Sequence, residues 1–254
     1  MASDEPPTSQ SAGSAAPCDN SRADFVGYRR RVKIDPKPGR VSAWLEDDFH
    51  HFGVELVHDG HTVQSVATHA PRYPWSTCPA AGTLLAARFK GAALASFGAG
   101  EDQNQHCTHI YDLAMAAARH ALDDKPTVYD ISLADDRGEG ACAELRVDGA
   151  LTLRWIMGPA GGRDGVPGGD HKAFGEWTRG LGPDLKEAGL MFRRGVMVAG
   201  GRRLDLKSYK TASEIGAKGA CYTFQPERAV QSKRILGAIR DFSHTPDAPL
   251  SGET

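Results

Sequence analysis

The chain has 254 residues, 40% of them hydrophobic, which is enough to bury one large core or two small ones. Its 30 Lys and Arg residues nearly balance 32 Asp and Glu residues, and the formal net charge of −2 excludes the broad basic field that drives nonspecific nucleic-acid binding. The apolar runs are far shorter than the roughly 20 residues of a membrane-spanning helix, so no membrane partner is expected.

Both ends of the chain have the composition of disordered tails. Residues 1–24 and 244–254 hold few large apolar side chains, so they cannot bury enough surface to offset the entropy lost on ordering. The N-terminus is acidic and lacks the apolar stretch of a secretory signal. The 5 cysteines include no C-x-x-C pair, which indicates neither a disulfide framework nor a zinc site. We therefore expect a cytoplasmic protein.

Residues 25–124 are expected to form a first unit of strands followed by helices. Three apolar-rich patterns predict antiparallel strands, at 41–46, 52–57 and 62–68. The Asp59-Gly60 pair is typical of a tight hairpin turn between the last two. Two helices are predicted to follow, at 79–89, where Pro79 suits the first turn, and at 108–122. The second helix carries one apolar stripe, formed by Ile110, Leu113, Ala117 and Ala121.

Residues 125–243 resemble the first unit in outline. Strands are predicted at 128–133, 141–147 and 151–157, and a helix at 184–198. The glycine-rich segment 158–169 is interpreted as a surface loop, because its prolines remove amide donors that a phosphate would use. The sequence thus predicts an α+β fold of two antiparallel three-stranded meanders with helices packed on one face. A diverged tandem repeat of about 90 residues is one interpretation of this pattern. Independent reuse of hairpins and Asp-Gly turns is the other.

The segment from His106 to His109 opens the second predicted helix and is the best candidate for chemistry. The positive half-charge of a helix N-terminus disfavours imidazolium and lowers the pKa of a nearby thiol. We therefore expect His109 to be a neutral general base and Cys107 to be partly thiolate. Asp112, three residues further on, is expected to orient or assist His109. The alternative is that Thr108 is only the N-cap of a helix.

Further site residues are expected near the second strand and before the first helix. His50 and His51 are neighbours, so alternation places their side chains on opposite faces of a strand. One of them is expected to meet His109 across the interface between sheet and helix, either as an acid-base pair or as two metal ligands. Tyr73 is expected to donate a hydrogen bond to a developing oxyanion. The predicted substrate-binding residues are Arg72, Trp75, Trp44 and His51.

These residues resemble the bacterial domain of unknown function family numbered 2889. The resemblance rests on Arg29-Arg30-Arg31, Trp44, His50, Tyr73-Pro74, Cys78-Pro79 and Cys107-Thr108-His109-Ile110. It spans residues 29–121, and Cys-Thr-His is its most specific element. The family usually carries His-Asp where this chain has His50-His51, and often a Glu where this chain has Asp112. Residues 219–226, with a predicted basic helix running to Phe242, are similar to longer members. The resemblance implies a fold and a site position but no reaction.

We expect a small enzyme that performs lyase or isomerase chemistry on an apolar or aromatic metabolite, with His109 as the base. No cofactor is expected, because the chain has no dinucleotide, P-loop or nucleophile-elbow signature. A hydrolase with Cys107 as nucleophile ranks lower. One alternative is a non-catalytic ligand-binding or assembly module, in which the aromatic segment forms the interface of a homodimer. Another is a metal site formed by His50, His106 and His109, although the His-x-x-His spacing does not place two imidazoles on one helix face.

Overall fold

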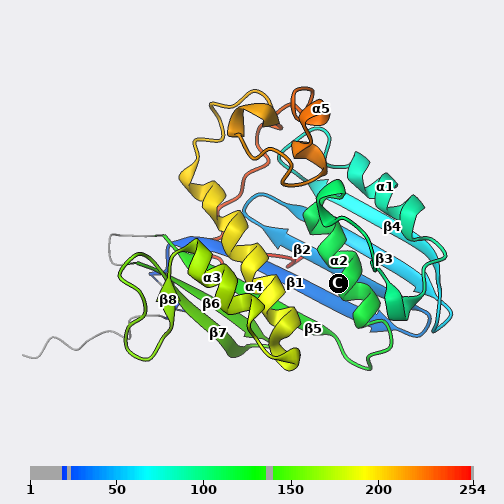
Figure 1. Ribbon diagram of the computed structural model, residues 1–254, viewed down its shortest axis with the longest axis horizontal. Helices are drawn as coiled ribbons and strands as arrows, with labels where there is room; N and C mark the ends of the chain where they lie inside the picture. Colours follow the sequence, from blue (N-terminus) through cyan, green and yellow to red (C-terminus); the bar gives the residue numbers. More distant parts are fainter. Residues whose placement is uncertain (1–18, 22–23, 136–139, 253–254) are drawn as a thin grey trace, which may run out of the picture.

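A computed structural model describes residues 19–21, 24–135 and 140–252 of the chain. They form one open sheet of eight strands in the order β4-β3-β2-β1-β5-β6-β7-β8, with the helices on one of its faces (Figure 1). The strands are β1 (Gly27–Lys37), β2 (Arg40–Asp47), β3 (His51–His58), β4 (Val63–Arg72), β5 (Thr127–Ala134), β6 (Ala141–Val147), β7 (Ala150–Met157) and β8 (Gly168–Gly169). All neighbours pair antiparallel except β7 and β8, which are parallel.

Two pairs of helices cover the two halves of the sheet. The helices are α1 (Ala80–Phe89), α2 (Thr108–Arg119), α3 (His171–Arg179), α4 (Lys186–Ala199) and α5 (Pro226–Ala229). Short 3-10 helices lie at Leu94–Ser96, Gln103–Gln105, Pro183–Leu185, Gly200–Arg203, Ala212–Ile215 and Tyr222–Phe224. Helix α2 packs on β2 and β3, and α4 packs on β5 and β6. Among the described residues, no helix is long and apolar enough to cross a membrane.

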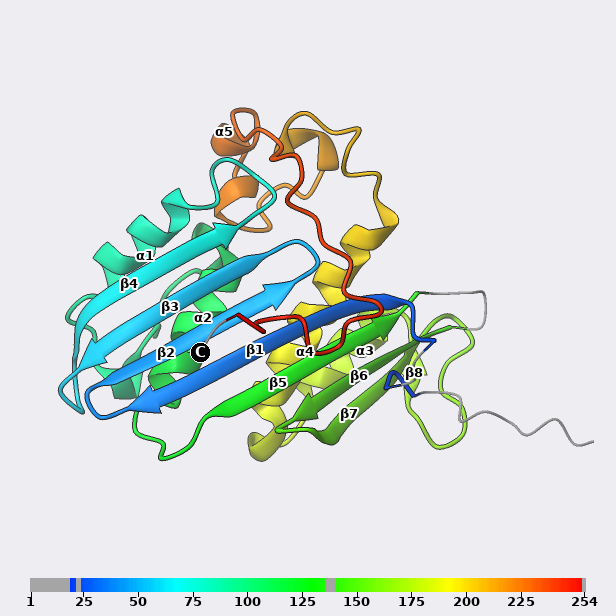
Figure 2. The same ribbon diagram turned by 180° about the vertical axis from the view of Figure 1, so that it is seen from behind.

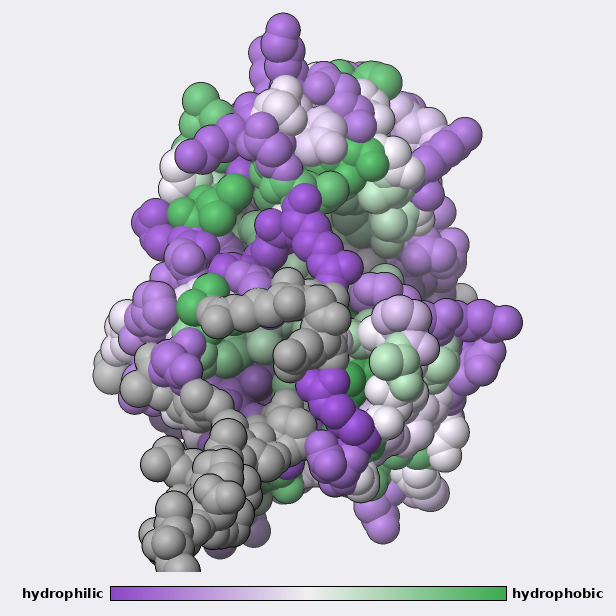
Figure 3. All heavy atoms as spheres, turned by 90° about the vertical axis from the view of Figure 1, so that its left-hand side faces the viewer, coloured by the Kyte–Doolittle hydropathy of each residue, from purple (hydrophilic) through white to green (hydrophobic). Residues whose placement is uncertain are grey.

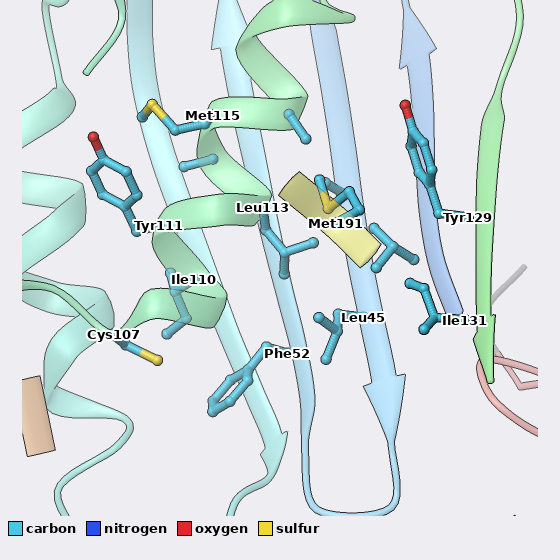
Figure 4. Close-up of a cluster of buried hydrophobic side chains, with 14 of the residues drawn as sticks. Leu45, Phe52, Cys107, Ile110, Tyr111, Leu113, Met115, Tyr129, Ile131 and Met191 are labelled. Atoms are coloured by element: carbon cyan, nitrogen blue, oxygen red, sulfur yellow. The ribbon is translucent and has the colours of Figure 1, made fainter. Parts of the chain in front are cut away.

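The core lies between the sheet and these helices. Figure 4 shows Ile110 and Leu113 of α2 beside Leu45 of β2 and Phe52 of β3. Each of these side chains is nearly or fully buried, and burying an aliphatic or aromatic side chain of this size contributes about 1.5–3 kcal/mol. The predicted apolar stripe of the second helix is therefore confirmed as the face that meets the sheet.

The central strand β1 is the main element that the sequence analysis missed. It pairs with both β2 and β5, and so joins the two predicted units into one sheet. Its buried positions alternate through Tyr28, Arg30, Val32 and Ile34. A charged arginine at an inward position hides the apolar alternation that identifies a half-buried strand. The first meander consequently has four strands instead of three.

The tandem repeat remains a prediction. The Asp59-Gly60 turn joins β3 to β4, whereas the Asp148-Gly149 turn joins β6 to β7. The strands β1 and β5 pair in the middle of the sheet. Counted outward from them, the first turn joins the third and fourth strands of one half, whereas the second turn joins the second and third strands of the other half. The two turns therefore give no support to a duplication. The boundary predicted at residue 124 falls in the connection between α2 and β5.

The C-terminal segment packs on the sheet, although its composition predicts a flexible tail. It crosses the face that the helices leave open (Figure 2). Phe242 and Leu250 are buried, and the Leu250 amide donates a 2.8 Å hydrogen bond to the Glu46 carboxylate. The predicted basic helix running to Phe242 is also wrong, because only Pro226–Ala229 is α-helical in that region.

The predicted N-terminal tail lies mostly outside the described residues, but Asn20 is buried against the sheet. Its side-chain amide donates to the Ser132 hydroxyl at 3.0 Å and to the Cys142 carbonyl at 3.1 Å. Cys142 is disulfide-bonded, whereas Cys78, Cys107 and Cys221 are free. The expectation of no disulfide is therefore wrong for Cys142.

Candidate functional site

The candidate site is built around Asp47, the last residue of β2. Its side chain is fully buried on the helix-covered face of the sheet. One carboxylate oxygen, Oδ1, accepts the backbone amides of Phe49 and His50, both at 2.8 Å. This is the local turn that an aspartate favours, because its short side chain can cap the amides two and three residues on. The turn brings His50 back over the carboxylate.

The other oxygen of Asp47 is held by two side chains from β1. The Tyr28 hydroxyl donates to Oδ2 at 2.8 Å, and Arg30 Nε donates to the same oxygen at 2.9 Å. Burial by itself raises the pKa of Asp47, but His50 and Arg30 outweigh burial and hold that pKa well below its ordinary value. Burial also raises the pKa of Tyr28 well above its ordinary value. Asp47 is therefore an ionised acceptor, and Tyr28 is a neutral donor.

His50 is oriented by this carboxylate. His50 Nδ1 lies 3.0 Å from Asp47 Oδ1, so this ring nitrogen carries the proton and donates to an ionised acceptor. The lone pair is then on Nε2, which faces away from Asp47. The His50 side chain keeps 11% of its surface exposed, whereas Asp47 keeps none. Of these two groups, the His50 side chain is therefore the one that solvent can reach.

His109 lies against the His50 ring, as the sequence predicted for one of the two neighbouring histidines. The two ring centroids are 4.0 Å apart, and Phe52 flanks both rings. The pKa of His109 is well below its ordinary value, because burial and then the nearby His50 and Arg30 disfavour the imidazolium. The direction agrees with the prediction, but the main cause is burial and not the helix dipole. His109 Nε2 is buried without a hydrogen-bond partner.

Cys107 contacts the other nitrogen of the His109 ring. Its Sγ atom lies 3.9 Å from His109 Nδ1. Burial raises the pKa of the Cys107 thiol, and the nearby Cys78 and Cys221 raise it further. The expected partial thiolate is therefore wrong, because desolvation outweighs the helix terminus. A protonated thiol can donate a weak hydrogen bond to Nδ1, which leaves the proton of a neutral His109 on Nε2.

Two predicted catalytic residues lie outside this group. Asp112 pairs with Arg194 of α4 at 2.6 Å and accepts from Gln103 at 3.4 Å. Tyr73 packs partly buried against the core. In the part of the chain that the structure describes, no hydrogen bond or ring contact joins Tyr73 to His50 or His109. The tyrosine of the site is Tyr28. The sequence signal for it is the two-residue spacing between Tyr28 and Arg30, which places both side chains on the same face of a strand.

The predicted substrate-binding residues are scattered. Arg72 donates to the backbone carbonyls of Asp47 at 2.6 Å and of His50 at 3.1 Å. It therefore stabilises the turn that holds His50 and does not point to the site. Trp75 is buried beside Phe224, at a centroid distance of 6.3 Å. Trp44 and His51 are 5.6 Å apart at their ring centroids. They point to the open face of the sheet, where Trp44 also stacks on His69, and cannot share a surface with His109.

The described residues contain one group with metal-ligand geometry, and it differs from the predicted one. Ligand atoms of Asp47, His50 and His109 lie within 4.8 Å of one another. His106 is elsewhere: its Nε2 atom lies 3.3 Å from the Glu101 carboxylate. Both oxygens of Asp47 already accept hydrogen bonds, and Arg30 places a positive charge beside them. A cation would have to displace these donors, so the arrangement favours a proton-transfer network over metal ligation.

Comparison of the chain with family models, curated proteins and solved structures finds no match. The resemblance to the family numbered 2889 therefore remains a prediction from the residues quoted for it. What this site can do has to be argued from its own geometry.

Proposed function

We propose that this protein is an enzyme that moves protons on an apolar or aromatic small molecule, in a reaction of the lyase or isomerase type. The observation that supports this most is the pairing of His50 with Asp47. Asp47 is buried and ionised, and both of its carboxylate oxygens already accept hydrogen bonds from the protein. Such a pairing fixes the tautomer of the histidine and favours its protonated form during reaction. His50 is thus the proposed general base, in place of His109.

The proposed reaction begins when His50 Nε2 takes a proton from a carbon next to a carbonyl group. The positive charge that forms on His50 is balanced by Asp47 at 3.0 Å. The electron pair moves onto the carbonyl oxygen, which accepts a hydrogen bond from Nε2–H of the neutral His109. A neutral imidazole can serve as an electrophile of this kind. In an isomerase, the electron pair then shifts through a conjugated double bond to another carbon, which takes the proton back from His50. In a lyase, the carbonyl re-forms, a carbon-carbon double bond forms, and the leaving group departs from the next carbon with its bonding electrons and takes the proton of His50.

The residues behind the two histidines act by positioning. Tyr28 and Arg30 hold the carboxylate of Asp47 in place from the central strand. Because His109 stays neutral, the proton that His50 gains does not create two cations 4.0 Å apart. We propose that Cys107 keeps its proton and orients His109. In this proposal Cys107 is a positioning residue and not the nucleophile of a hydrolase.

The test uses deuterium exchange, which does not require the substrate to be known beforehand. Pools of aromatic and aliphatic carbonyl compounds are incubated with the protein in D2O, and deuterium uptake at carbon is measured by mass spectrometry. His50→Gln should slow uptake about 10²–10⁴-fold, the usual cost of losing a general base. His58→Gln is the matched control, because His58 is a buried histidine at the other end of β3, and its Nε2 atom lacks a hydrogen-bond partner.

A second measurement keeps the proposal testable if no compound exchanges. The ¹⁵N chemical shifts of the histidine rings report which nitrogen carries the proton. We expect the proton of His50 on Nδ1 and a neutral His109 at pH 7. A proton on His50 Nε2, or equal exchange rates in His50→Gln and His58→Gln, would overturn the proposal.

A metal site is the second candidate, because Asp47, His50 and His109 bring their ligand atoms within 4.8 Å. Zinc added to metal-stripped protein distinguishes the two. Under the proton-transfer proposal, His50→Gln and His58→Gln should bind zinc equally weakly. Tight binding by the unmodified protein that is lost only in His50→Gln would favour the metal site.

A cytoplasmic location remains a proposal based on the N-terminal composition. The disulfide at Cys142 weighs against it, because disulfides are rare in reducing compartments.

A further inference from the structure

A cavity of about 380 Å³ lies next to the histidine network. It is bounded by the end of α4, the following 3-10 helix Gly200–Arg203 and the turn after β2. Its apolar wall includes Tyr28, Phe49, Leu133, Val196 and Leu206. Its volume is within the range of small-molecule sites, about 300–1,000 Å³. Figure 3 views the molecule from the side of the β6–β8 half, where hydrophobic residues lie in small patches among hydrophilic ones.

At the inner end of the cavity lies a carboxyl group of which only one oxygen has a partner. The Asp48 side chain is 1% exposed, and its Oδ2 atom pairs with Arg202. Its Oδ1 atom is buried without a hydrogen-bond partner. A buried acceptor left unpaired costs about 1–3 kcal/mol, and a hydroxyl group of a ligand would remove this cost. Asp48 is one of the residues that line the cavity, so its carboxyl group lies at the cavity wall.

The outer end of the cavity offers positive charge. Arg202 is shared among the carboxylates of Asp48, Asp135 and Asp241. Two further arginines that line the cavity, Arg203 and Arg240, are exposed. Within residues 24–135 and 140–252, neither guanidinium of this second pair forms an ion pair. The Arg240 guanidinium donates to the Gly237 carbonyl, at 3.3 Å, and guanidinium groups without an ion pair at the mouth of an apolar cavity favour a carboxylate there.

We propose that this cavity binds a small organic anion with an apolar body, with its carboxylate at Arg203 and Arg240 and a hydroxyl group at Asp48. The apolar wall of Tyr28 and Phe49 then receives the body of the ligand. The same two rings contact the histidine network, because Tyr28 donates to Asp47 and the Phe49 ring lies edge-on to His50 at 6.1 Å. A ligand in the cavity is thus one aromatic layer away from the proposed base.

The inference does not rest on the proposed function. Neither His50 nor His109 lines the cavity, so the bound anion is a ligand of this cavity and not the compound from which His50 takes a proton, and its binding is measured without turnover. The probes for calorimetry are 3-(4-hydroxyphenyl)propanoate, 3-phenylpropanoate, which lacks the hydroxyl group, and 4-ethylphenol, which lacks the carboxylate. We expect one molecule of the first probe to bind per chain. The probe without a hydroxyl group should bind several-fold more weakly, and the probe without a carboxylate at least tenfold more weakly.

Variants assign each contact to its residue. Arg203→Gln combined with Arg240→Gln should weaken binding of the first probe at least tenfold, whereas Lys207→Gln removes a nearby exposed charge outside the cavity and should leave binding unchanged. Asp48→Leu should abolish the preference for the hydroxylated probe. Equal binding of 4-ethylphenol, or unchanged affinity in the double arginine variant, would overturn the inference.

His109→Gln separates this inference from the proposed function. His109 does not line the cavity, so the variant should bind the first probe with unchanged affinity even where deuterium exchange is lost. Loss of binding in His109→Gln would contradict the cavity as the site. Retained binding together with retained exchange would leave the cavity intact and count against the role proposed for His109.

Discussion

The two halves of the sheet bury their helices in different ways. Beneath α3 and α4, the interface is made of aromatic rings, with Trp155, Phe174, Trp177 and Phe192 at centroid distances of 5.0–6.4 Å. Beneath α2, a charged and hydrogen-bonded group of Arg30, Asp47 and His50 occupies part of the interface. The aromatic half shows that this sheet can close against helices mainly through apolar rings. Since a buried ion pair is often no more stabilising than apolar side chains of the same volume, the charged group is better explained by function than by packing.

Breaking the charged group should give the largest effect. Asp47→Asn removes the negative charge but leaves Arg30 buried, and this should lower the free energy of unfolding by about 3–5 kcal/mol in urea denaturation. The double variant Arg30→Met, Asp47→Asn should recover part of this loss, because no unpaired charge remains and the side-chain amide oxygen can still accept the Phe49 and His50 amides. If Asp47→Asn cost less than 1 kcal/mol, the carboxylate would not carry the charge assigned to it.

Opening the aromatic half should lower stability without touching the proposed chemistry. Phe174 is 1% exposed, so Phe174→Ala leaves a cavity and should cost about 3 kcal/mol or more. Deuterium exchange by the folded variant should stay within twofold of the unmodified protein. A large loss of exchange at temperatures where Phe174→Ala is fully folded would show that the two halves are not independent.

The neighbouring acids Asp47 and Asp48 should respond to pH in opposite directions. Burial raises the pKa of Asp48 from 3.8 to about 7, so the folded state holds its proton more tightly than the unfolded state. Stability from Asp48 should therefore fall as the pH rises from about 4 to about 7 and then level off, with a change of about 1–3 kcal/mol between pH 5 and 7. The difference in free energy of unfolding between the unmodified protein and Asp48→Asn should carry this slope, as measured by urea denaturation at several pH values. The opposite contribution of His109, whose pKa is lowered, is common to both proteins and cancels in that difference.

Asp47 supplies the contrast to Asp48. Its folded pKa is depressed, so its contribution is fully present above the unfolded pKa of about 3.9 and is lost only as the pH falls below it. It therefore adds no slope between pH 5 and 7. A difference between the two proteins that stays constant from pH 5 to 7 would contradict the assignment.

The smallest effect concerns the thiols. In protein denatured without reductant, Cys78, Cys107 and Cys221 should react with a thiol reagent and Cys142 should not. Finding all 5 cysteines of the chain reactive would mean that Cys142 is reduced in solution, and would restore the expectation of a reducing compartment.

Elements set by local pattern were predictable from the sequence. Six of the strands and the helices α1, α2 and α4 lie close to their predicted ranges, because alternation, turn residues and a helical apolar stripe act over a few neighbouring positions. The approach of His50 to His109 was also anticipated, since both sit at the ends of predicted elements.

The rest of the site depends on contacts between distant segments. Asp112 was expected to serve His109, but it pairs with Arg194, 82 positions away on α4. The role of Asp47 could not be predicted, because it depends on Tyr28 and Arg30 of β1. That strand could not be recognised from the sequence, since Arg30 interrupts its apolar alternation. Tyr73 and Trp75 were grouped with the histidines by a sequence pattern that cannot tell one surface from another.

The pairing of β1 with β5 also means that the sheet can be completed only after β5 has been synthesised. It joins Gly27 to Ala134 and Ile34 to Thr127, so the two middle strands of the sheet meet only after about a hundred intervening residues have been brought together. Such long-range pairing is entropically costly and slows folding relative to hairpins of neighbouring strands. On the ribosome, β1 has emerged long before its partner. Until β5 follows, one edge of β1, with its run of arginines, must remain unpaired, and positive charge of this kind is what discourages an exposed strand from joining another chain.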